Sequence, residues 1–367
     1  MIRLRRAIVI AFGDARPGAH ELEVDVNGER ATAIAYPDLC GPVTVGDVVI
    51  LNTTAVSLAL GTGGVHFVVA VEGAQVGGDD APGRVMKARY TPLQTAVSSV
   101  EETHRDELER SSGLEQTPVV CAPLHSMLGP IAAGAKRAGN ARVVYVMTDG
   151  AALPGAFSRS AFELRDAGLI DGWITSGQAF GGELEAVTVW SAMLAAKDVL
   201  GADVIVVADG PGNLGTDTTW GVSALANGNA LNAVAVLGGR PIPSLRISFA
   251  DPRERHRSVS HHSLTILREV CLVPTDVPVP TLEDDQQRRS VWEALRNAKL
   301  EDRHQLVEVD GRPALAELAD RGIEPRSMGR GVADDPAYFL AAGAAGVLAG
   351  RTAAGNRRWR AARDASS

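Results

Sequence analysis

The pattern of apolar and polar positions divides the chain into a strand-rich first part and a longer part in which strands alternate with helices. In the first part, short alternating or β-branched runs predict strands at residues 7–10, 21–26, 31–35, 48–51 and 65–71. Gly, Pro, Asp and Asn separate these runs, as is typical of tight turns. Closing the sheet would remove its exposed edges, so residues 1–100 are expected to form a small β-barrel or sandwich.

From residue 118 the pattern changes to apolar runs separated by longer amphipathic stretches. The runs predict strands at residues 119–122, 142–147, 172–175, 204–208 and 244–249. The stretches between them predict helices at residues 127–138, 159–167 and 183–200. This alternation predicts a mainly parallel sheet covered on both faces. Residues 118–350 are therefore expected to form a Rossmann-like, three-layer α/β domain.

Two polar segments border this second domain. Residues 101–117 lack an apolar stripe and are predicted to be a linker or an exposed helix, and residues 351–367 are predicted to be a flexible tail. No run reaches the roughly 20 apolar residues of a membrane helix, and the apolar run near the N-terminus stops at Gly13. A soluble, cytoplasmic protein is expected.

Polar and glycine-rich segments follow the predicted strands of the parallel sheet. Ligands bind outside the carboxyl ends of such strands, so these segments are expected to line one crevice. The segment GPGNLGT follows the fourth strand, and its Gly210, Gly212, Gly215 and Thr216 are candidates for holding a phosphate or carboxylate. It matches neither the P-loop nor the dinucleotide-binding spacing, so a tight turn that needs Gly only for its geometry explains it equally well. Gly182, after the third strand, is a further candidate.

The segment ISFADPRERHRSVSHHS concentrates groups suited to binding anions and moving protons. Arg253, Arg255 and Arg257 are candidate anion ligands, and Asp251, His261 and His262 are candidate catalytic residues. The alternative is a solvated surface loop whose charges satisfy one another. A metal site formed by Asp251, His256, His261 and His262 is a minority interpretation, because neighbouring residues of a strand face opposite sides.

A third set of candidates lies after the first two parallel strands. His125, Ser126 and Asp149 are residue types that form nucleophile arrangements. The chain lacks a G-x-S-x-G elbow, and capping of a helix is the simpler explanation for Ser126, as it is for Ser158. His125 and Asp149 remain candidate catalytic residues, and Ser126 remains a candidate ligand-binding residue.

Composition restricts the partners. The chain has 36 basic and 44 acidic residues, a net charge of −8, and 4% aromatic residues. This balance disfavours nucleic acid and anionic membranes as partners. The cysteines Cys40, Cys121 and Cys271 are far apart and form no CxxC pair, so neither a cysteine-rich zinc site nor a disulfide framework is expected.

Several long segments together resemble an uncharacterised bacterial family from actinobacteria and spore-forming relatives, which is known only as a domain of unknown function. They are LNTTAVSLALGTGGVHFVVA, MKARYTPLQTAVSSVEE, YVMTDGAALP, SGQAFGGELEAV, GPGNLGTDTTWG and ISFADPRERHRSVSHHS. The resemblance covers about residues 1–350. It implies no activity and no catalytic residues, because the family has no established function.

The leading hypothesis from the sequence is an enzyme that acts on a small anionic metabolite by acid–base chemistry, as a hydrolase or a transferase. The glycine-rich loop would hold the anion and an arginine would neutralise it. His261 or His262, oriented by Asp149 or Asp251, would move the proton. A non-catalytic sensor of a nucleotide or metabolite and a structural assembly subunit are the alternatives. The cofactor, the metal content and any homo-oligomer stay open.

Overall fold

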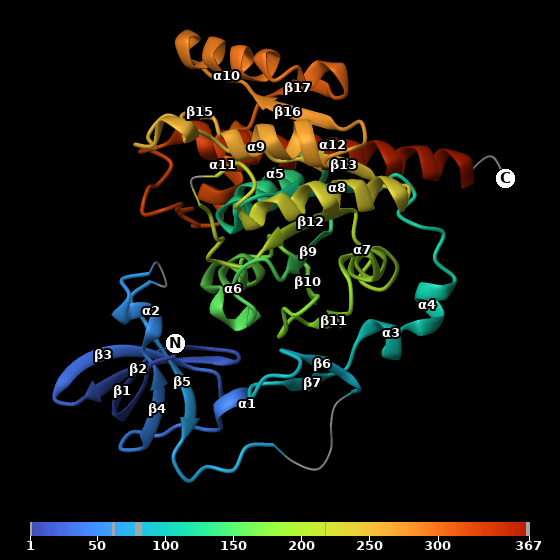
Figure 1. The fold of residues 1–367 in the computed structure, drawn as a ribbon. Coiled ribbons are helices and arrows are strands. Elements are labelled where there is room, and N and C mark those ends of the chain that lie inside the picture. The colour runs from blue at the N-terminus through green and yellow to red at the C-terminus, as the bar shows by residue number, and fades with distance from the viewer. Residues whose placement is uncertain (1, 61–62, 78–82, 217, 365–367) are drawn as a thin grey trace. The chain divides into compact units, whose positions relative to one another are not determined.

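The structure is a computed structural model that describes residues 2–60, 63–77, 83–216 and 218–364, with side chains up to residue 359 (Figure 1). The chain divides into two compact units, Met1–Ser98 and Ser99–Ser367. Among the described residues, no helix has both the length and the apolar character needed to cross a membrane.

The first unit is built around a closed barrel with the strand order β1-β2-β3-β5-β4. The strands of the first unit are β1 (Leu4–Arg16), β2 (Ala19–Val26), β3 (Glu29–Ala35), β4 (Val48–Asn52), β5 (His66–Val71), β6 (Val85–Lys87) and β7 (Thr95–Val97). The short helices are α1 (Pro37–Cys40) and α2 (Thr54–Ser57). Strands β3 and β5 pair in parallel, and the other barrel pairs are antiparallel. Of the barrel and the sandwich left open by the sequence, the barrel is confirmed.

Alternation along the barrel strands explains the barrel core. Side chains of a strand point to opposite faces in turn, so every second residue of β1, β2 and β4 faces inward. Ala7 and Val9, Leu22 and Val24, and Val49 and Leu51 are the buried pairs.

The second unit is built around a parallel sheet with the strand order β11-β10-β9-β12-β8-β13. These strands are β8 (Pro118–Ala122), β9 (Val143–Thr148), β10 (Gly172–Ser176), β11 (Leu184–Ala186), β12 (Val204–Asp209) and β13 (Arg240–Pro243). The smaller pairs are β14 (Ile247–Ser248) with β15 (Ser258–Val259), and β16 (Asp276–Pro280) with β17 (Gln305–Val309). All pairs of the main sheet are parallel, which confirms the predicted mainly parallel sheet.

Helices cover both faces of this sheet (Figure 1). The α-helices are α3 (Val100–Thr103), α4 (Arg105–Glu109), α5 (Leu128–Gly139), α6 (Arg159–Asp166), α7 (Val189–Asp198), α8 (Ala226–Val236), α9 (His261–Thr265), α10 (Asp285–Asn297), α11 (Arg312–Asp320) and α12 (Pro336–Asp364). Shorter turns are the 3₁₀ segments η1 (His125–Met127), η2 (Gly155–Phe157), η3 (Ser223–Leu225), η4 (Glu254–His256) and η6 (Leu300–Asp302), and the π-helical segment η5 (Ile266–Val270).

The apolar strand residues serve two cores in turn. In β12, Ile205 and Val207 pack with α7 and α8, whereas Val204, Val206 and Ala208 pack with α5 and α12. Because both faces are buried, the strands have continuous apolar sequences rather than alternating ones. This explains why the apolar runs of the second unit were recognisable in the sequence.

The predicted helix over residues 183–200 is wrong at its start. Residues Leu184–Ala186 form β11, and α7 begins after Thr188, whose hydroxyl accepts a hydrogen bond from Ser191 N at 3.2 Å. Glu185 lies in β11 rather than at a helix N-terminus. Its carboxylate accepts hydrogen bonds from Thr175 Oγ1 at 2.8 Å and Gly181 N at 2.6 Å, which hold β11 against β10.

The predicted strand over residues 244–249 is also misplaced. The last strand of the parallel sheet along the chain is β13, which contains prolines at positions 241 and 243. Residues Ile247–Ser248 pair instead with β15 in a hairpin. Proline usually argues against a strand because it lacks an N–H. It fits here because β13 is the edge of the sheet and pairs only with β8.

The two bordering segments contain regular structure. Helix α4 lies within residues 101–117, α3 begins one residue before them, and both pack against α7. The last helix, α12, runs to Asp364 and so includes residues 351–364 of the predicted flexible tail, since Ala and Arg in this segment favour helix. Residues 365–367 of the predicted tail lie outside the described residues.

Candidate functional site

His125 is buried at the carboxyl end of β8. Its Nε2 lies 2.7 Å from Ser158 Oγ, and its Nδ1 lies 3.2 Å from both the Tyr145 hydroxyl and the carbonyl oxygen of Asp209. Ser158 also caps α6, as predicted, by accepting a hydrogen bond from Ala161 N at 3.0 Å. Burial lowers the pKa of His125 to about 4, so the ring is neutral at pH 7. Both nitrogens of His125 therefore contact groups of the fold itself.

Ser126 has different partners from His125. Its hydroxyl lies 2.6 Å from the hydroxyl of Tyr338 and 3.0 Å from Ser327 Oγ. It lies inside the turn η1 rather than at a capping position, so the predicted cap is wrong. Among the described residues, the hydrogen-bond contacts of His125 and those of Ser126 go to different groups, in contrast to the shared bond of a Ser–His nucleophile pair.

Asp209 ends β12 in the middle of the sheet and is 1% exposed. Its carboxylate accepts hydrogen bonds from Thr148 Oγ1 at 2.5 Å, Gly150 N at 3.2 Å and Asn213 Nδ2 at 3.2 Å. Burial raises the pKa of Asp209, and these hydrogen bonds partly offset the rise. Asp209 was not among the candidate site residues chosen from the sequence, although its carboxylate directly follows the apolar run VIVVA.

Asp149 and Gly182 both shape the loop after β10. Asp149 Oδ2 accepts a hydrogen bond from Gln178 N at 2.8 Å. Gly182 N donates to Thr175 Oγ1 at 3.1 Å, and a Cβ at Gly182 would lie 2.8 Å from Thr175 N. The negative charge of Asp149 also contributes to the raised pKa of Asp209. Two carboxylates therefore lie close together at this edge of the sheet.

The glycine-rich loop folds into a small hairpin. Gly210 lies where a Cβ would meet Met147 Cε at 2.5 Å, and Gly212 has a φ of +95°, so each needs the absence of a side chain. Gly215 bridges to Val222, and Thr216 Oγ1 donates to Gly221 O at 3.0 Å. The next helical turn, η3, begins only at Ser223. In the described residues of this segment, a helix N-terminus therefore does not follow the loop directly.

His256, His261 and His262 form a compact histidine cluster. Each contributes a ring nitrogen, and these nitrogens all lie within 4.8 Å of one another. The ring centroids of His261 and His262 are 3.9 Å apart, and His256 lies 5.3 Å and 5.2 Å from them. His261 and His262 open α9 rather than lying in a strand, so the objection that neighbouring histidines face opposite sides does not apply.

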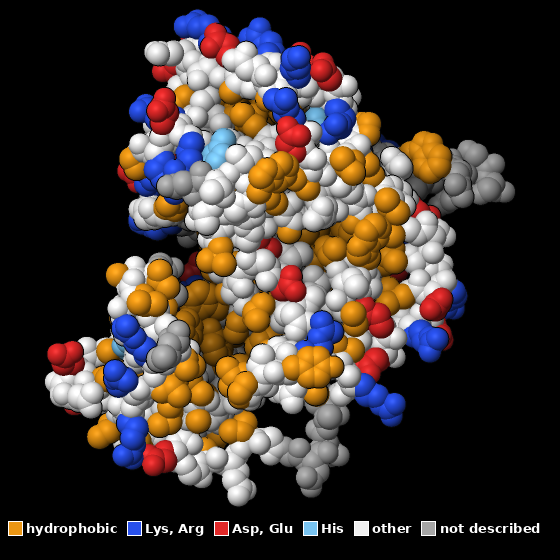
Figure 2. Space-filling model, viewed as in Figure 1, with side chains coloured by type: hydrophobic (Ala, Val, Ile, Leu, Met, Phe, Trp, Pro, Cys, Tyr) orange, Lys and Arg blue, Asp and Glu red, His pale blue; other side chains and the backbone are white. Residues whose placement is uncertain are grey.

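The histidines lie among positive charges. Burial lowers the pKa of His256 to about 3 and that of His262 to about 4, and the guanidinium of Arg246 adds to both shifts. Burial and the charges of Arg255 and Arg246 lower the pKa of His261. Figure 2 shows a histidine surface beside a group of basic side chains over the part of the second unit that carries β15 and α9.

Asp251 neutralises part of this positive charge. Its fully buried carboxylate lies 2.9 Å from Arg246 Nη2 and 2.8 Å from Arg253 Nη2, and 4.0 Å from Arg330 Nη2. Burial alone would raise the pKa of Asp251, but the hydrogen bonds from Arg253 and the charge of Arg246 bring it below its usual range. The Asp251 carboxylate therefore forms ion pairs with arginines, and the predicted role in which it orients His261 or His262 is wrong.

The remaining residues of this segment differ in position. Arg255 interacts electrostatically with His261 and His262. Arg257 is exposed and continues the turn after η4. Sequence reasoning missed Arg246, a single arginine inside an otherwise apolar stretch, which is 9% exposed and lies next to the cluster.

The glycine-rich loop and the histidine cluster lie on neighbouring elements. The loop is hydrogen-bonded to η3 through Leu214 and Ser223, and η3 packs against α9. Within the loop, Asn213 Nδ2 donates hydrogen bonds to Pro123 O and to Asp209 Oδ2. The glycine-rich loop and the histidine cluster therefore lie in the same region, but their side chains contact different residues.

The chain was compared with protein families and with curated proteins. Residues 32–346 match DUF3866, a family described as a protein of unknown function. The chain belongs to this family. The match includes the parallel sheet and the histidine cluster, and it confirms the resemblance to a domain of unknown function, while bacterial origin stays a prediction. The comparison with curated proteins finds no match.

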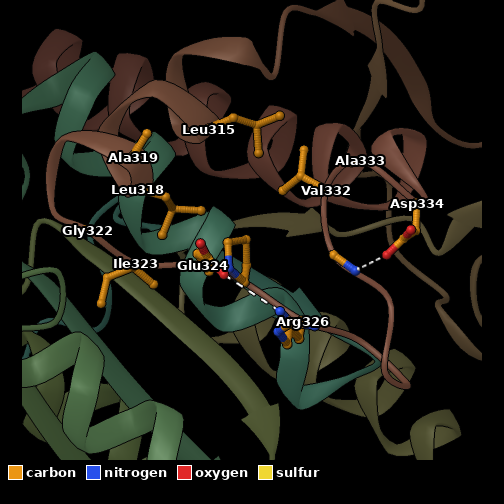
Figure 3. Close-up of a pocket in the computed structure, with 12 residues that line it drawn as sticks. Leu315, Leu318, Ala319, Gly322, Ile323, Glu324, Arg326, Val332, Ala333 and Asp334 are labelled. Atoms are coloured by element: carbon orange, nitrogen blue, oxygen red, sulfur yellow. Dashed lines mark hydrogen bonds and ion pairs between the residues drawn. The ribbon is translucent and has the colours of Figure 1, made fainter.

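A separate hollow of about 650 Å³ lies beside α11 (Figure 3). Leu315, Leu318 and Ile323 give it apolar walls, and the loop over residues 322–334 completes it. At its edge Arg326 lies 3.7 Å from Glu324. Its lining is mostly apolar, so this hollow offers less chemistry than the histidine cluster.

Proposed function

We propose that this protein is an enzyme that acts on a small molecule carrying a phosphate or carboxylate group, and that the reaction takes place at the histidine cluster. The observation that carries the proposal is the convergence of the three imidazoles beside Arg246 and Arg255. Imidazole nitrogens can move a proton or bind a metal, and guanidinium groups bind phosphate and carboxylate oxygens. Hydrolysis and group transfer both use this combination.

Charge favours the histidine cluster over the glycine-rich loop as the place where an anion binds. The carboxylates of Asp149 and Asp209 lie beside the loop and would repel an anion. At the cluster, the charges of Arg246 and Arg253 lower the pKa of both His256 and His262, so the electrostatic potential at these rings is raised by nearby guanidinium groups. A positive potential at a partly buried site attracts an anionic ligand.

The architecture of the second unit supports this proposal. A Rossmann-like arrangement fits a parallel sheet whose chain connections run in opposite directions from its middle strands. In such folds, binding sites are formed by segments that follow the carboxyl ends of strands. The cluster belongs to the segment that follows β13, so its position agrees with this rule.

Anion binding is tested by calorimetric titration with inorganic phosphate and with sulfate. The wild-type protein is expected to bind both, and Arg255→Gln is expected to weaken binding at least tenfold. Arg257→Gln is the matched control, because Arg257 is exposed two residues further along the same segment. Equal binding by the wild type and Arg255→Gln would contradict the proposed anion site.

Turnover is tested with a panel of phosphate monoesters and carboxylic acids, with products identified by mass spectrometry. Conversion that is lost in the His261→Ala, His262→Ala double variant, in folded protein, supports the enzyme. A compound that binds and raises the melting temperature but stays chemically unchanged would instead favour a metabolite sensor.

A further inference from the structure

We propose that His256, His261 and His262 hold a divalent transition-metal ion of the zinc class and leave a further coordination position open for a ligand. This inference rests on the proposed function, because it assigns a chemical role to the imidazoles of the same site. It reverses the preference from the sequence, which favoured a site without a metal.

The first argument is the position of the ring nitrogens. The three nitrogens lie within 4.8 Å of one another. In a tetrahedral site with zinc–nitrogen bonds of about 2.0–2.1 Å, ligand nitrogens lie roughly 3.3 Å apart. The nitrogens are therefore close enough that a shared ion requires them to approach by roughly 1.5 Å at most.

The second argument is the state of the nitrogens. His261 Nε2 and His262 Nε2 are buried and have no hydrogen-bond partner among the described residues. His262 as a whole is 6% exposed. Buried polar atoms in proteins are nearly always satisfied, so two such nitrogens on neighbouring histidines of one cluster indicate a missing partner. A metal ion satisfies both at once, because each nitrogen would donate its lone pair.

The third argument is the second hydrogen bond of His256. Its Nδ1 lies 2.8 Å from Ser260 Oγ, and Ser260 is fully buried. When Nδ1 donates its proton to this hydroxyl, Nε2 carries the lone pair that a metal requires. Metal-binding histidines characteristically donate their other ring N–H to such a partner, which fixes the ring and its tautomer.

The ligand set defines the class of metal. Three imidazoles without a thiolate or carboxylate suit Zn²⁺ and its neighbours Co²⁺, Ni²⁺ and Cu²⁺, and do not suit Mg²⁺ or Ca²⁺. Three protein ligands are the usual number in catalytic zinc sites, where a water or the substrate takes the fourth position. His261 is partly exposed, so that position has access to solvent.

The surrounding arginines define the fourth ligand. The charges of Arg246, Arg253 and Arg255 act on the cluster, and Asp251 is the buried counter-charge of Arg246 and Arg253. A bare dication is disfavoured there, whereas a metal ion that carries an anion is not. Metal and anion are therefore expected to strengthen each other's binding by the same factor, since such coupling is reciprocal.

The test is titration of chelator-treated, full-length protein with Co²⁺, followed by visible absorption. One equivalent of Co²⁺ is expected to give the intense d–d bands of a four- or five-coordinate ion, and Zn²⁺ is expected to remove them. His261→Ala and His262→Ala are expected to weaken Co²⁺ binding at least 100-fold, and Ser260→Ala about tenfold or more. His104→Gln is the control, because His104 lies in the segment between α3 and α4, outside the cluster.

Folding is checked on the same samples by circular dichroism and thermal melting. Zn²⁺ is expected to raise the melting temperature of the wild type and of His104→Gln, and to leave that of folded His261→Ala unchanged. Weak, non-saturating Co²⁺ binding, or tight binding that survives in both histidine variants, would overturn the metal site.

Sulfate titrations separate this inference from the proposed function. Saturable Co²⁺ binding that sulfate does not change supports the metal site and contradicts the anion site. Sulfate binding by a protein that fails to bind Co²⁺ overturns the metal site and leaves the anion site standing. Tighter Co²⁺ binding in the presence of sulfate supports both.

Discussion

His125 is a base held where its charged form is disfavoured. Burial lowers its pKa to about 4, against 6.5 for an ordinary histidine. Between these pH values the unfolded chain takes up a proton at His125 and the folded protein does not, so lowering the pH destabilises the fold. The difference amounts to about 3 kcal/mol of unfolding free energy.

We therefore predict that the stability advantage of the wild type over His125→Asn shrinks by about 3 kcal/mol between pH 7 and pH 4. Urea unfolding at a series of pH values measures this difference. His104→Gln, at a partly exposed histidine, serves as the control. A wild-type advantage that stays constant over this range would show that folding does not lower the pKa of His125.

Asp251, in contrast to His125, is buried in its charged form, between the guanidinium groups of two arginines. Removing the charge by Asp251→Asn leaves Arg246 without its closest counter-charge, so we expect a loss of about 3 kcal/mol in unfolding free energy. Asp310→Asn is the control, because Asp310 pairs with Arg312 at 2.9 Å in an exposed position. There we expect a loss below about 1 kcal/mol. Similar losses in both variants, measured by urea unfolding, would argue against a special role for the buried network.

At the residue scale, the sequence identified the segment but not the arrangement inside it. A concentration of Arg and His after a strand was visible, and His256, His261 and His262 come together. Arg246 and Ser260 were missed because their importance depends on burial, which a sequence without an alignment does not display. Asp251 was assigned to the histidines because charge alone does not reveal which partner a carboxylate chooses.

At the scale of elements, glycines allow α5 and α12 to pack closely. A Cβ at Gly346 would lie 2.0 Å from Ile131 O, and one at Gly139 would lie 2.2 Å from Gly350 O. The two helix backbones therefore touch, which only residues without side chains permit. This close packing explains why the residues of the pattern GAAGVLAG in α12 are so small.

This packing predicts opposite effects for one substitution at two positions of α12. Gly346→Ala forces the helices apart and should destabilise the protein by about 2–3 kcal/mol. Gly355→Ala places its Cβ where no atom lies within 4 Å, and should stabilise the protein by up to about 1 kcal/mol because Ala favours helix. Thermal melting of the two variants measures both effects, and a loss of stability at Gly355→Ala would contradict this account.

Sequence patterns predicted the elements that bury apolar surface and misjudged those held by particular hydrogen bonds. Strands β8, β9 and β12 are continuous apolar runs and were recognised. Strand β11 was missed because Glu185, an acidic residue typical of a helix start, is held by Thr175 and Gly181 instead. Strand β13 was missed because its prolines are tolerated only at an edge, and the sequence does not say which strand is the edge.

At the scale of the whole molecule, the hydrophobic cores follow the two units. The barrel core draws on residues between Ala7 and Val71, and the two cores around the parallel sheet draw on residues between Val100 and Ala353. The alternation of strands and helices was enough to predict the parallel sheet, and the run of short strands in residues 1–100 predicted a small barrel or sandwich, because each core is formed by sequence-local periodic elements.

We predict that a fragment of residues 99–367 folds without the barrel. Both cores of the sheet, the histidine cluster and the arginines beside it lie inside this range. The fragment should unfold in one cooperative transition and bind Co²⁺ with the affinity and stoichiometry of the full chain. Scanning calorimetry and Co²⁺ absorption measure the two properties. A fragment that folds cooperatively but binds Co²⁺ at least tenfold more weakly would mean that the first unit contributes to the metal site, whereas loss of the cooperative transition would mean that the second unit depends on the barrel for its stability.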